Sequence, residues 1–180
     1  MIYIVLDLEA TCWNGKRLAP NEIIEIGAIA INEAGETEGE FNTFVKPSLA
    51  PQLSDFCTKL TSITQDMVDD APLYPAAHQA FLDWIHNFDQ EYWLCSWGFY
   101  DKSQFKHDCK LHGLDKDWLK KHISVKHQYH KIKPTKRPIG MKGALALEDI
   151  KLDGTHHRGI DDARNIAKIF VRYLNEWTFK

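Results

Sequence analysis

Two acidic side chains near the N-terminus have the spacing of a metal site. Asp7 and Glu9 close an apolar, β-branched run that starts at residue 2, and side chains alternate along a strand, so both carboxylates would point to one face. Like charges at the end of a buried strand raise each other's pKa, and a divalent cation is the simplest group that would compensate them. Asp-x-Glu is also common by chance, so two ordinary acids on the rim of a sheet are the alternative.

Three further side chains could join this pair. Asp101 follows an apolar run, Asp162 lies in the first turn of a predicted C-terminal helix, and His157 precedes Asp162 by five residues in a glycine-flanked loop. Each has a plain structural explanation: a helix cap, an acid at a helix N-terminus, and a surface or packed histidine. Together they would suit two divalent ions that clamp a phosphoryl group, with an imidazole to activate water.

The hydrophobic pattern predicts the elements that must position these side chains. Strands are expected at 2–8, 22–31, 37–46, 92–97 and, less regularly, 122–126. Helices are expected from Ser62 to before Pro72 and at 75–88, 101–113, 142–148 and 161–177. The proline- and glycine-containing segment 128–141 is expected to be a mobile basic loop. This order predicts an α/β fold, in which an antiparallel meander of three strands is followed by further strands and helices cover both faces of a mixed five-stranded sheet.

Length and composition indicate one globular domain over residues 1–180, with 44% apolar and 26% charged residues. They exclude a long disordered tail, a collagen-like repeat and a coiled coil. No apolar run reaches the ~18–20 residues of a membrane span, and the first residues lack the basic region of a signal peptide. The four cysteines form no Cys-x-x-Cys pair, so a reduced, cytoplasmic protein is expected.

The net charge of −3 hides a strong asymmetry along the chain. Residues 1–101 carry a net charge of −12, residues 102–142 carry +9, and the remainder is neutral. A basic segment can be the electrostatic footprint of a phosphate backbone, although a solvated helix face with a loop explains it too. Because the first half is acidic, any contact with nucleic acid is expected at one place only.

Five segments, in order, carry the motifs of a nuclease family. They are VLDLEATCW at 5–13, NEIIEIG at 21–27, LSDFCTKLTSITQ at 53–65 with Pro72 after it, SWGFYD at 96–101 and HRGIDDARNIA at 157–167. Over nearly its whole length the chain resembles the DEDDh 3′–5′ exonucleases, and within them the Eri-like and KapD-like branch. The resemblance implies an RNase H-like fold.

The resemblance also implies the roles of the acidic residues and the histidine. Asp7, Glu9, Asp101 and Asp162 would bind two divalent cations, Mg²⁺ or Mn²⁺, and Glu9 and His157 would be catalytic, His157 as the general base. The neighbours His156 and Asp161 do not have the five-residue spacing of the last motif. The fourth motif departs from some animal Eri-like members, in which the acid directly follows the tryptophan. Here Trp97 takes the asparagine position of the wider family's Asn-x-x-x-Asp spacing, which retains Asp101.

The implied reaction is hydrolysis of single-stranded 3′ ends to 5′-mononucleotides, with RNA favoured over DNA by the branch that the chain resembles. The implied substrate contacts are Ala10, Thr11, Leu60 and Ile63, with Trp97 as a stacking surface. Lys133, Lys136 and Arg137 of the basic loop could hold phosphates. Two alternatives stay open: a regulatory module that binds a protein partner on the same fold, and an exonuclease that proofreads or repairs DNA.

Overall fold

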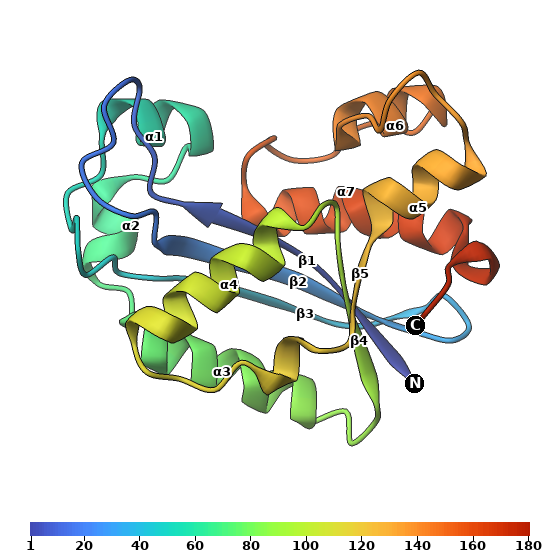
Figure 1. Cartoon of the computed structure of the whole chain (residues 1–180), viewed down its shortest axis with the longest axis horizontal. Coiled ribbons are helices and arrows are strands. Elements are labelled where there is room, and N and C mark those ends of the chain that lie inside the picture. The colour runs from blue at the N-terminus through green and yellow to red at the C-terminus, as the bar shows by residue number, and fades with distance from the viewer.

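Five strands form one mixed sheet in the order β3-β2-β1-β4-β5, in a computed structural model that describes residues 1–180 (Figure 1). The strands are β1 (Ile2–Ala10), β2 (Ile23–Asn32), β3 (Thr37–Phe44), β4 (Tyr92–Ser96) and β5 (His122–Ser124). The first three strands pair antiparallel, whereas β4 pairs parallel to β1 and β5 parallel to β4. The predicted mixed five-stranded sheet, including its antiparallel meander, is confirmed.

Helices cover both faces of this sheet. They are α1 (Asp55–Thr61), α2 (Gln65–Asp69), α3 (Tyr74–His86), α4 (Tyr100–Leu111), α5 (Val125–Ile132), α6 (Met141–Leu147) and α7 (Gly159–Arg172), with short 3₁₀ turns at Asp117–Leu119 and Leu174–Glu176. Helices α3 and α4 pack on one face of the sheet, and α5, α6 and α7 pack on the other. No helix has the length and apolar character needed to cross a membrane.

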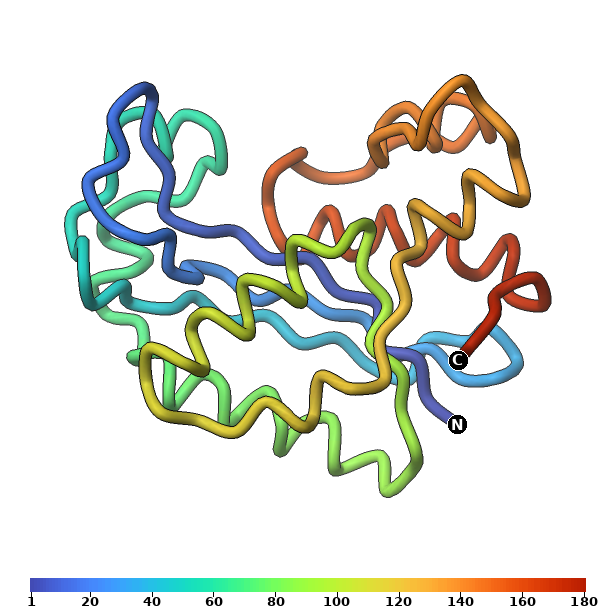
Figure 2. The backbone as a smooth tube through the Cα atoms, viewed as in Figure 1, coloured from blue at the N-terminus to red at the C-terminus, as the bar shows by residue number.

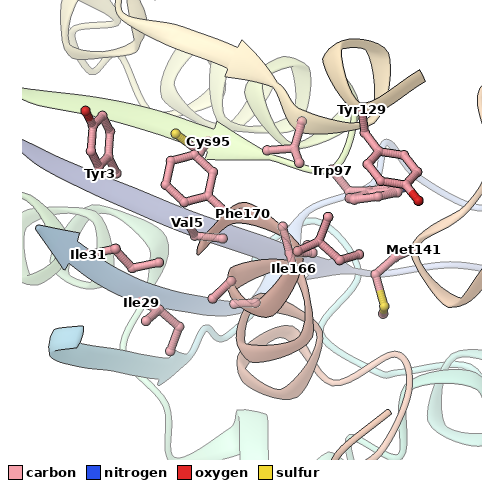
Figure 3. Packing of buried hydrophobic residues seen from close by; sticks show 14 of the residues in the cluster. Tyr3, Val5, Ile29, Ile31, Cys95, Trp97, Tyr129, Met141, Ile166 and Phe170 are labelled. Atoms are coloured by element: carbon pink, nitrogen blue, oxygen red, sulfur yellow. The ribbon is translucent and has the colours of Figure 1, made fainter. Parts of the chain in front are cut away.

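The central strand β1 is buried on both sides, which explains its nearly continuous apolar sequence. Tyr3 and Val5 point into the core beneath α7, where they lie in one cluster with Ile166 and Phe170 (Figure 3). The alternate residues Ile2, Ile4 and Leu6 point into the second core, beneath α3 and α4. This alternation brings Asp7 and Glu9 to the end of β1 on the α7 side of the sheet, so the cores fix the position of the acidic pair.

The start of the expected helix at Ser62 is wrong. Ser62 has a left-handed φ of 61° and closes α1, a helix that the hydrophobic pattern did not predict. The Oγ atom of Ser54 accepts a hydrogen bond from the Cys57 N–H at 3.0 Å and so caps the start of α1. The next helix, α2, begins only at Gln65. A serine followed by glutamine three residues later therefore marked the end of one helix rather than the start of another.

The prediction of a loop over 128–141 is wrong in its first part. Helix α5 runs to Ile132, because Val125 and Tyr129, one turn apart, are both buried against the core. The prolines act only after this point, and the loop covers residues 133–140. Asp101 is likewise not a helix cap: α4 begins at Tyr100, and Asp101 lies in its first turn.

The N-terminus of α7 lies directly on β2, although the two are far apart in sequence (Figure 2). A Cβ atom at Gly27 would overlap the backbone of Gly159 and Ile160. A Cβ atom at Gly159 would in turn lie 3.1 Å from the backbone oxygen of Asp7, and Asp7 pairs with Gly27 across the sheet. The two glycines therefore let the start of α7 approach the strands that carry the acidic pair.

We expect Gly27→Ala to destabilise the protein by about 3 kcal/mol, because the added methyl group must push α7 away from the sheet. For a chain of this size that corresponds to a fall in Tm of roughly 6–12 °C, measurable by calorimetry. Gly143→Ala in α6 is the control, since its Cβ would meet only Ile139, at ordinary contact distances from 3.7 Å. Equal Tm values for the two variants would contradict the close approach.

Candidate active site

The five residues with predicted chemistry converge on one cavity of about 390 Å³. Asp7 and Glu9 come from the end of β1, Asp101 from the first turn of α4, Asp162 from the first turn of α7, and His157 from the loop before α7. The structure thus brings together side chains from four places in the sequence. Because their positions follow from a strand end, two helix starts and a short loop, the site is held by regular elements.

The carboxylates are close enough to share ligands. The oxygens of Asp7, Glu9 and Asp162 lie within 4.8 Å of one another. Asp101 is tied to β1, since its Oδ1 atom accepts a hydrogen bond from the Leu8 N–H at 3.2 Å. The N–H of His157 donates to Asp162 Oδ2 at 3.0 Å, which joins the loop to α7.

Burial and mutual repulsion set the electrostatics of this group. Burial, then the charges of Asp101 and Glu9, raise the pKa of Asp7 well above its ordinary value. Burial, followed by Asp162, raises the pKa of Glu9 to about 8, and burial raises the pKa of Asp101 to about 6. Such a set resists full ionisation unless a cation joins it. An all-oxygen donor set of this kind fits a hard divalent cation such as Mg²⁺ or Mn²⁺ and does not resemble a typical zinc site.

The loop before α7 carries two histidines rather than one. His157 adopts a left-handed φ of 66°, a conformation that is uncommon outside glycine. Its ring stacks on that of His156 with centroids 3.9 Å apart, and burial and His156 lower the pKa of His157. His156 also lines the cavity, with Nδ1 at 3.0 Å from Asp162 Oδ2. The five-residue spacing of the last motif excluded His156 from the predicted site, whereas the structure places His156 beside Asp162.

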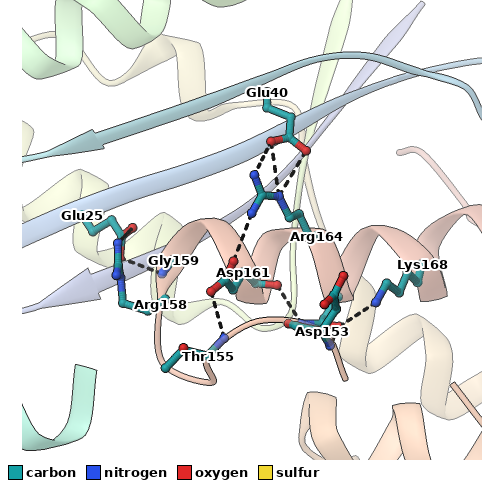
Figure 4. Close-up of polar contacts among 10 residues, drawn as sticks. Glu25, Glu40, Asp153, Thr155, Arg158, Gly159, Asp161, Arg164 and Lys168 are labelled. Atoms are coloured by element: carbon teal, nitrogen blue, oxygen red, sulfur yellow. Dashed lines mark hydrogen bonds and ion pairs between the residues drawn. The ribbon is translucent and has the colours of Figure 1, made fainter. Parts of the chain in front are cut away.

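Asp161, which the motif spacing set aside, points away from the cavity. One of its oxygens accepts a hydrogen bond from the Thr155 N–H at 2.9 Å, and the other pairs with Arg164 at 3.1 Å (Figure 4). Adjacent acids on α7 thus have separate surroundings: Asp161 fixes the preceding loop, and Asp162 faces the other carboxylates.

A buried ion pair anchors the start of α7 beneath the site. Glu25, in the apolar strand β2, is fully buried and accepts hydrogen bonds from the Gly159 N–H at 2.8 Å and from Arg158 at 3.1 Å (Figure 4). The Arg158 guanidinium also lies 5.1 Å from the centre of the Phe44 ring. Sequence reasoning missed this pair, although a glutamate inside an otherwise apolar strand was the signal that could have revealed it.

Most of the predicted apolar substrate contacts lie outside the cavity. Ala10, Thr11 and Ile63 are buried, and Thr11 Oγ1 accepts a hydrogen bond from the Glu22 N–H at 3.0 Å. Leu60 is 37% exposed on α1 and does not line the cavity. Trp97 does line it, but this residue is only 8% exposed and its Nε1–H donates to the Ile139 carbonyl at 3.2 Å.

The predicted basic contacts also lie elsewhere. Lys133, Lys136 and Arg137 do not line the cavity, and Lys133 sits over the ring of Tyr173 at 5.9 Å. The lysines that line the cavity are Lys126, in the first turn of α5, and Lys142, in the first turn of α6. Sequence reasoning did not single them out, because they belong to different elements that only the fold brings together.

Comparison with known proteins agrees with this geometry. The family model described as Exonuclease matches residues 4–170. The chain is 34% identical to ERI1 exoribonuclease 2 of Xenopus laevis over 95% of its own length and 28% of that protein, and 35% identical to 3'-5' exoribonuclease 1 of Homo sapiens over 96% of its length and 52% of that protein. The chain therefore spans about half or less of these relatives.

A solved structure described as the nuclease domain of 3'hExo, a DEDDh family member bound to rAMP, superposes with a TM-score of 0.94 at 32% identity, covering 99% of this chain and 96% of that one. Cell-death related nuclease 4, at 21% identity and a TM-score of 0.88, shares the fold. Fold and site thus define a DEDDh exonuclease domain with an RNase H-like fold. Within that family, the chain belongs to the Eri-like branch.

We expect Arg158→Ala to destabilise the protein by about 3 kcal/mol at neutral pH, because it leaves the buried Glu25 without its cation. The control is Lys121→Ala, whose partner Glu91 is 72% exposed and lies away from α7, and about 0.5 kcal/mol is expected there. Urea denaturation would measure both. Similar losses of unfolding free energy in the two variants would show that the Glu25–Arg158 pair does not anchor α7.

A second prediction concerns repulsion among the carboxylates. Because the pKa of Asp7 is raised in the folded state, its ionisation at neutral pH costs stability, so Asp7→Asn should stabilise the protein in EDTA by about 1 kcal/mol, or roughly 2–4 °C in Tm. Saturating Mg²⁺ should raise the Tm of the unmodified protein by several degrees and that of the variant by much less. Asp66→Asn, an exposed acid on α2, is the control. A lower Tm for Asp7→Asn in EDTA would refute the repulsion.

Proposed function

We propose that this chain is a metal-dependent 3′–5′ exonuclease that releases 5′-mononucleotides from single-stranded 3′ ends and prefers RNA to DNA. The observation that carries the proposal is the convergence of Asp7, Glu9, Asp101, Asp162 and His157 on one cavity. Relatives named exoribonucleases and a structural neighbour bound to rAMP support RNA as the substrate.

The four carboxylates would hold two divalent cations, Mg²⁺ or Mn²⁺. When bound, such cations supply neutralisation of phosphoryl charge and make a bound water more acidic. This chain's own residues do the rest. The Leu8 N–H and the loop N–H of His157 hold Asp101 and Asp162 in place, so the carboxylates need little rearrangement when they bind cations.

His157 would take the proton from the attacking water at its imidazole. Its lowered pKa keeps the ring neutral near pH 7, as a general base requires. Lys126 and Lys142 line the cavity and would balance the charge of the phosphates. Tyr100, which is 54% exposed and also lines the cavity, offers a more accessible stacking face than Trp97. A reducing, cytoplasmic location remains part of the proposal, on the cysteine spacing of the sequence.

The test is a cleavage assay with 5′-labelled single-stranded RNA and DNA of one sequence, in Mg²⁺, Mn²⁺ or EDTA. We expect a ladder that shortens from the 3′ end, only with metal, and faster on RNA. Asp7→Asn should abolish the ladder, and His157→Ala should lower kcat roughly 10²–10⁴-fold.

No cleavage of either substrate by folded protein with both metals present would refute the proposal. Faster cleavage of DNA than of RNA would refute the proposed RNA preference and favour a role at DNA ends. A His157→Ala variant with unchanged kcat, under conditions where the chemical step limits the rate, would remove His157 from the role of base.

A further inference from the structure

A second groove, of about 790 Å³, is lined by residues next in sequence to residues of the catalytic cavity. It is bounded by the open edge of β5, by α5 and by the C-terminal segment, and its lining includes Phe99, His122, Ser124, His127 and Lys131. The two spaces are neighbours along the chain: Phe99 lies between Gly98 and Tyr100, which line the catalytic cavity, and Lys126 of that cavity precedes His127 of the groove. A strand whose 3′ end lay in the cavity could therefore continue into this groove.

An aromatic platform stands at the start of the groove. Phe99 is 55% exposed, and its ring stacks on the exposed ring of His127 with centroids 4.9 Å apart and planes 27° apart. The His127 ring is held in turn, because its Nδ1 lies 2.7 Å from the Oγ of the buried Ser124. One face of Phe99 is thus supported and the ring remains largely exposed, which is a suitable arrangement for stacking a nucleobase.

The charges around the platform suit phosphates. Lys131 lines the groove and Lys126 lines the adjoining cavity, both on α5. Lys102 and Lys106 of α4 are close enough to act with burial in lowering the pKa of His122 to about 4, so this histidine adds no charge near pH 7. Glu176 is the one acidic side chain among the lining residues. The exposed aromatic face and the lysines favour a nucleic-acid strand over an acidic peptide, which would leave the stacking face unused.

We propose that this groove binds the nucleotides that precede the 3′-terminal nucleotide, with a base stacked on Phe99 and a phosphate near Lys131. The inference rests on the proposed exonuclease function and adds a substrate-binding surface to it. The groove has about twice the volume of the catalytic cavity, which gives room for more than one nucleotide. Base stacking tolerates any sequence, so the groove would select length and single-strandedness rather than sequence.

The test compares the p-nitrophenyl ester of a 5′-mononucleotide, which has no preceding nucleotide, with a dodecamer that ends in the same nucleotide. Phe99→Ala should raise the KM for the dodecamer about 5-fold or more, the loss expected for one stacked base, and leave the KM for the ester nearly unchanged. Phe99→Trp should restore the KM. Lys131→Gln should lower the slope of log affinity against log salt concentration by about 0.7, as for one phosphate contact on a single strand. Lys120→Gln, an exposed lysine that lines a separate cleft, should change neither.

Binding of the dodecamer to the Asp7→Asn protein, measured by fluorescence anisotropy, separates this proposal from the function on which it rests. If the unmodified protein cleaves neither substrate but Phe99→Ala and Lys131→Gln still weaken binding, the exonuclease proposal fails and the groove remains. Equal rises in KM for the mononucleotide ester and the dodecamer would show that Phe99 only supports the start of α4, and would overturn the groove. Unchanged dodecamer affinity in both variants would overturn it as well, and displacement of the dodecamer by an acidic peptide would assign the groove to a protein partner.

Discussion

The close contact between the N-terminus of α7 and strand β2 is the constraint on which the rest of the site depends. Two glycines, Gly27 and Gly159, allow backbone to meet backbone, and Glu25 holds the approach from within the sheet. Without this contact, repulsion between like charges would move Asp162 away from Asp7 and Glu9. Buried hydrogen bonds and tight packing between α7 and β2 thus hold in place an arrangement that the repulsion among the carboxylates opposes.

The repulsion among the carboxylates lowers the folding stability of the domain at its catalytic site. Two apolar cores, one on each face of the sheet, supply the favourable burial, and the end of β1 carries the cost of grouped carboxylates. This loss of stability is confined to the end of β1. Asp7 and Glu9 directly follow core residues, and these would keep the strand in the sheet in the absence of any cation. A binding site that is assembled before its ion arrives needs little reorganisation on binding, which favours affinity.

Sequence reasoning predicted the features that depend on local periodicity. The alternation of β1 placed Asp7 and Glu9 on one face, and the resemblance to the family's last motif, with its five-residue spacing, selected His157 and Asp162. It failed where tertiary packing decides. The burial of Tyr129 extends α5 into a segment that was predicted to be a loop because of its later prolines. The pattern at Ser62 was interpreted as a helix start, so α1, which ends there, was not predicted. Lys126 and Lys142 could not be selected, since nothing in the sequence indicates that the starts of α5 and α6 meet at one cavity.

The fold assigns the acidic and basic segments of the chain to different elements of the structure. The basic segment 102–142 contains most of α4 and all of α5, whereas the acidic first half supplies β1 to β4 and the helices α1 to α3 (Figure 1). The two parts of the chain meet at the catalytic cavity, where Asp7, Glu9 and Asp101 come from the acidic half and Lys126 and Lys142 come from the basic segment. A polyanion would be attracted by the lysines and repelled by the carboxylates, so a strand could enter by its terminus more readily than it could lie across the site. Such a field would discriminate an end from an internal position before any base is contacted.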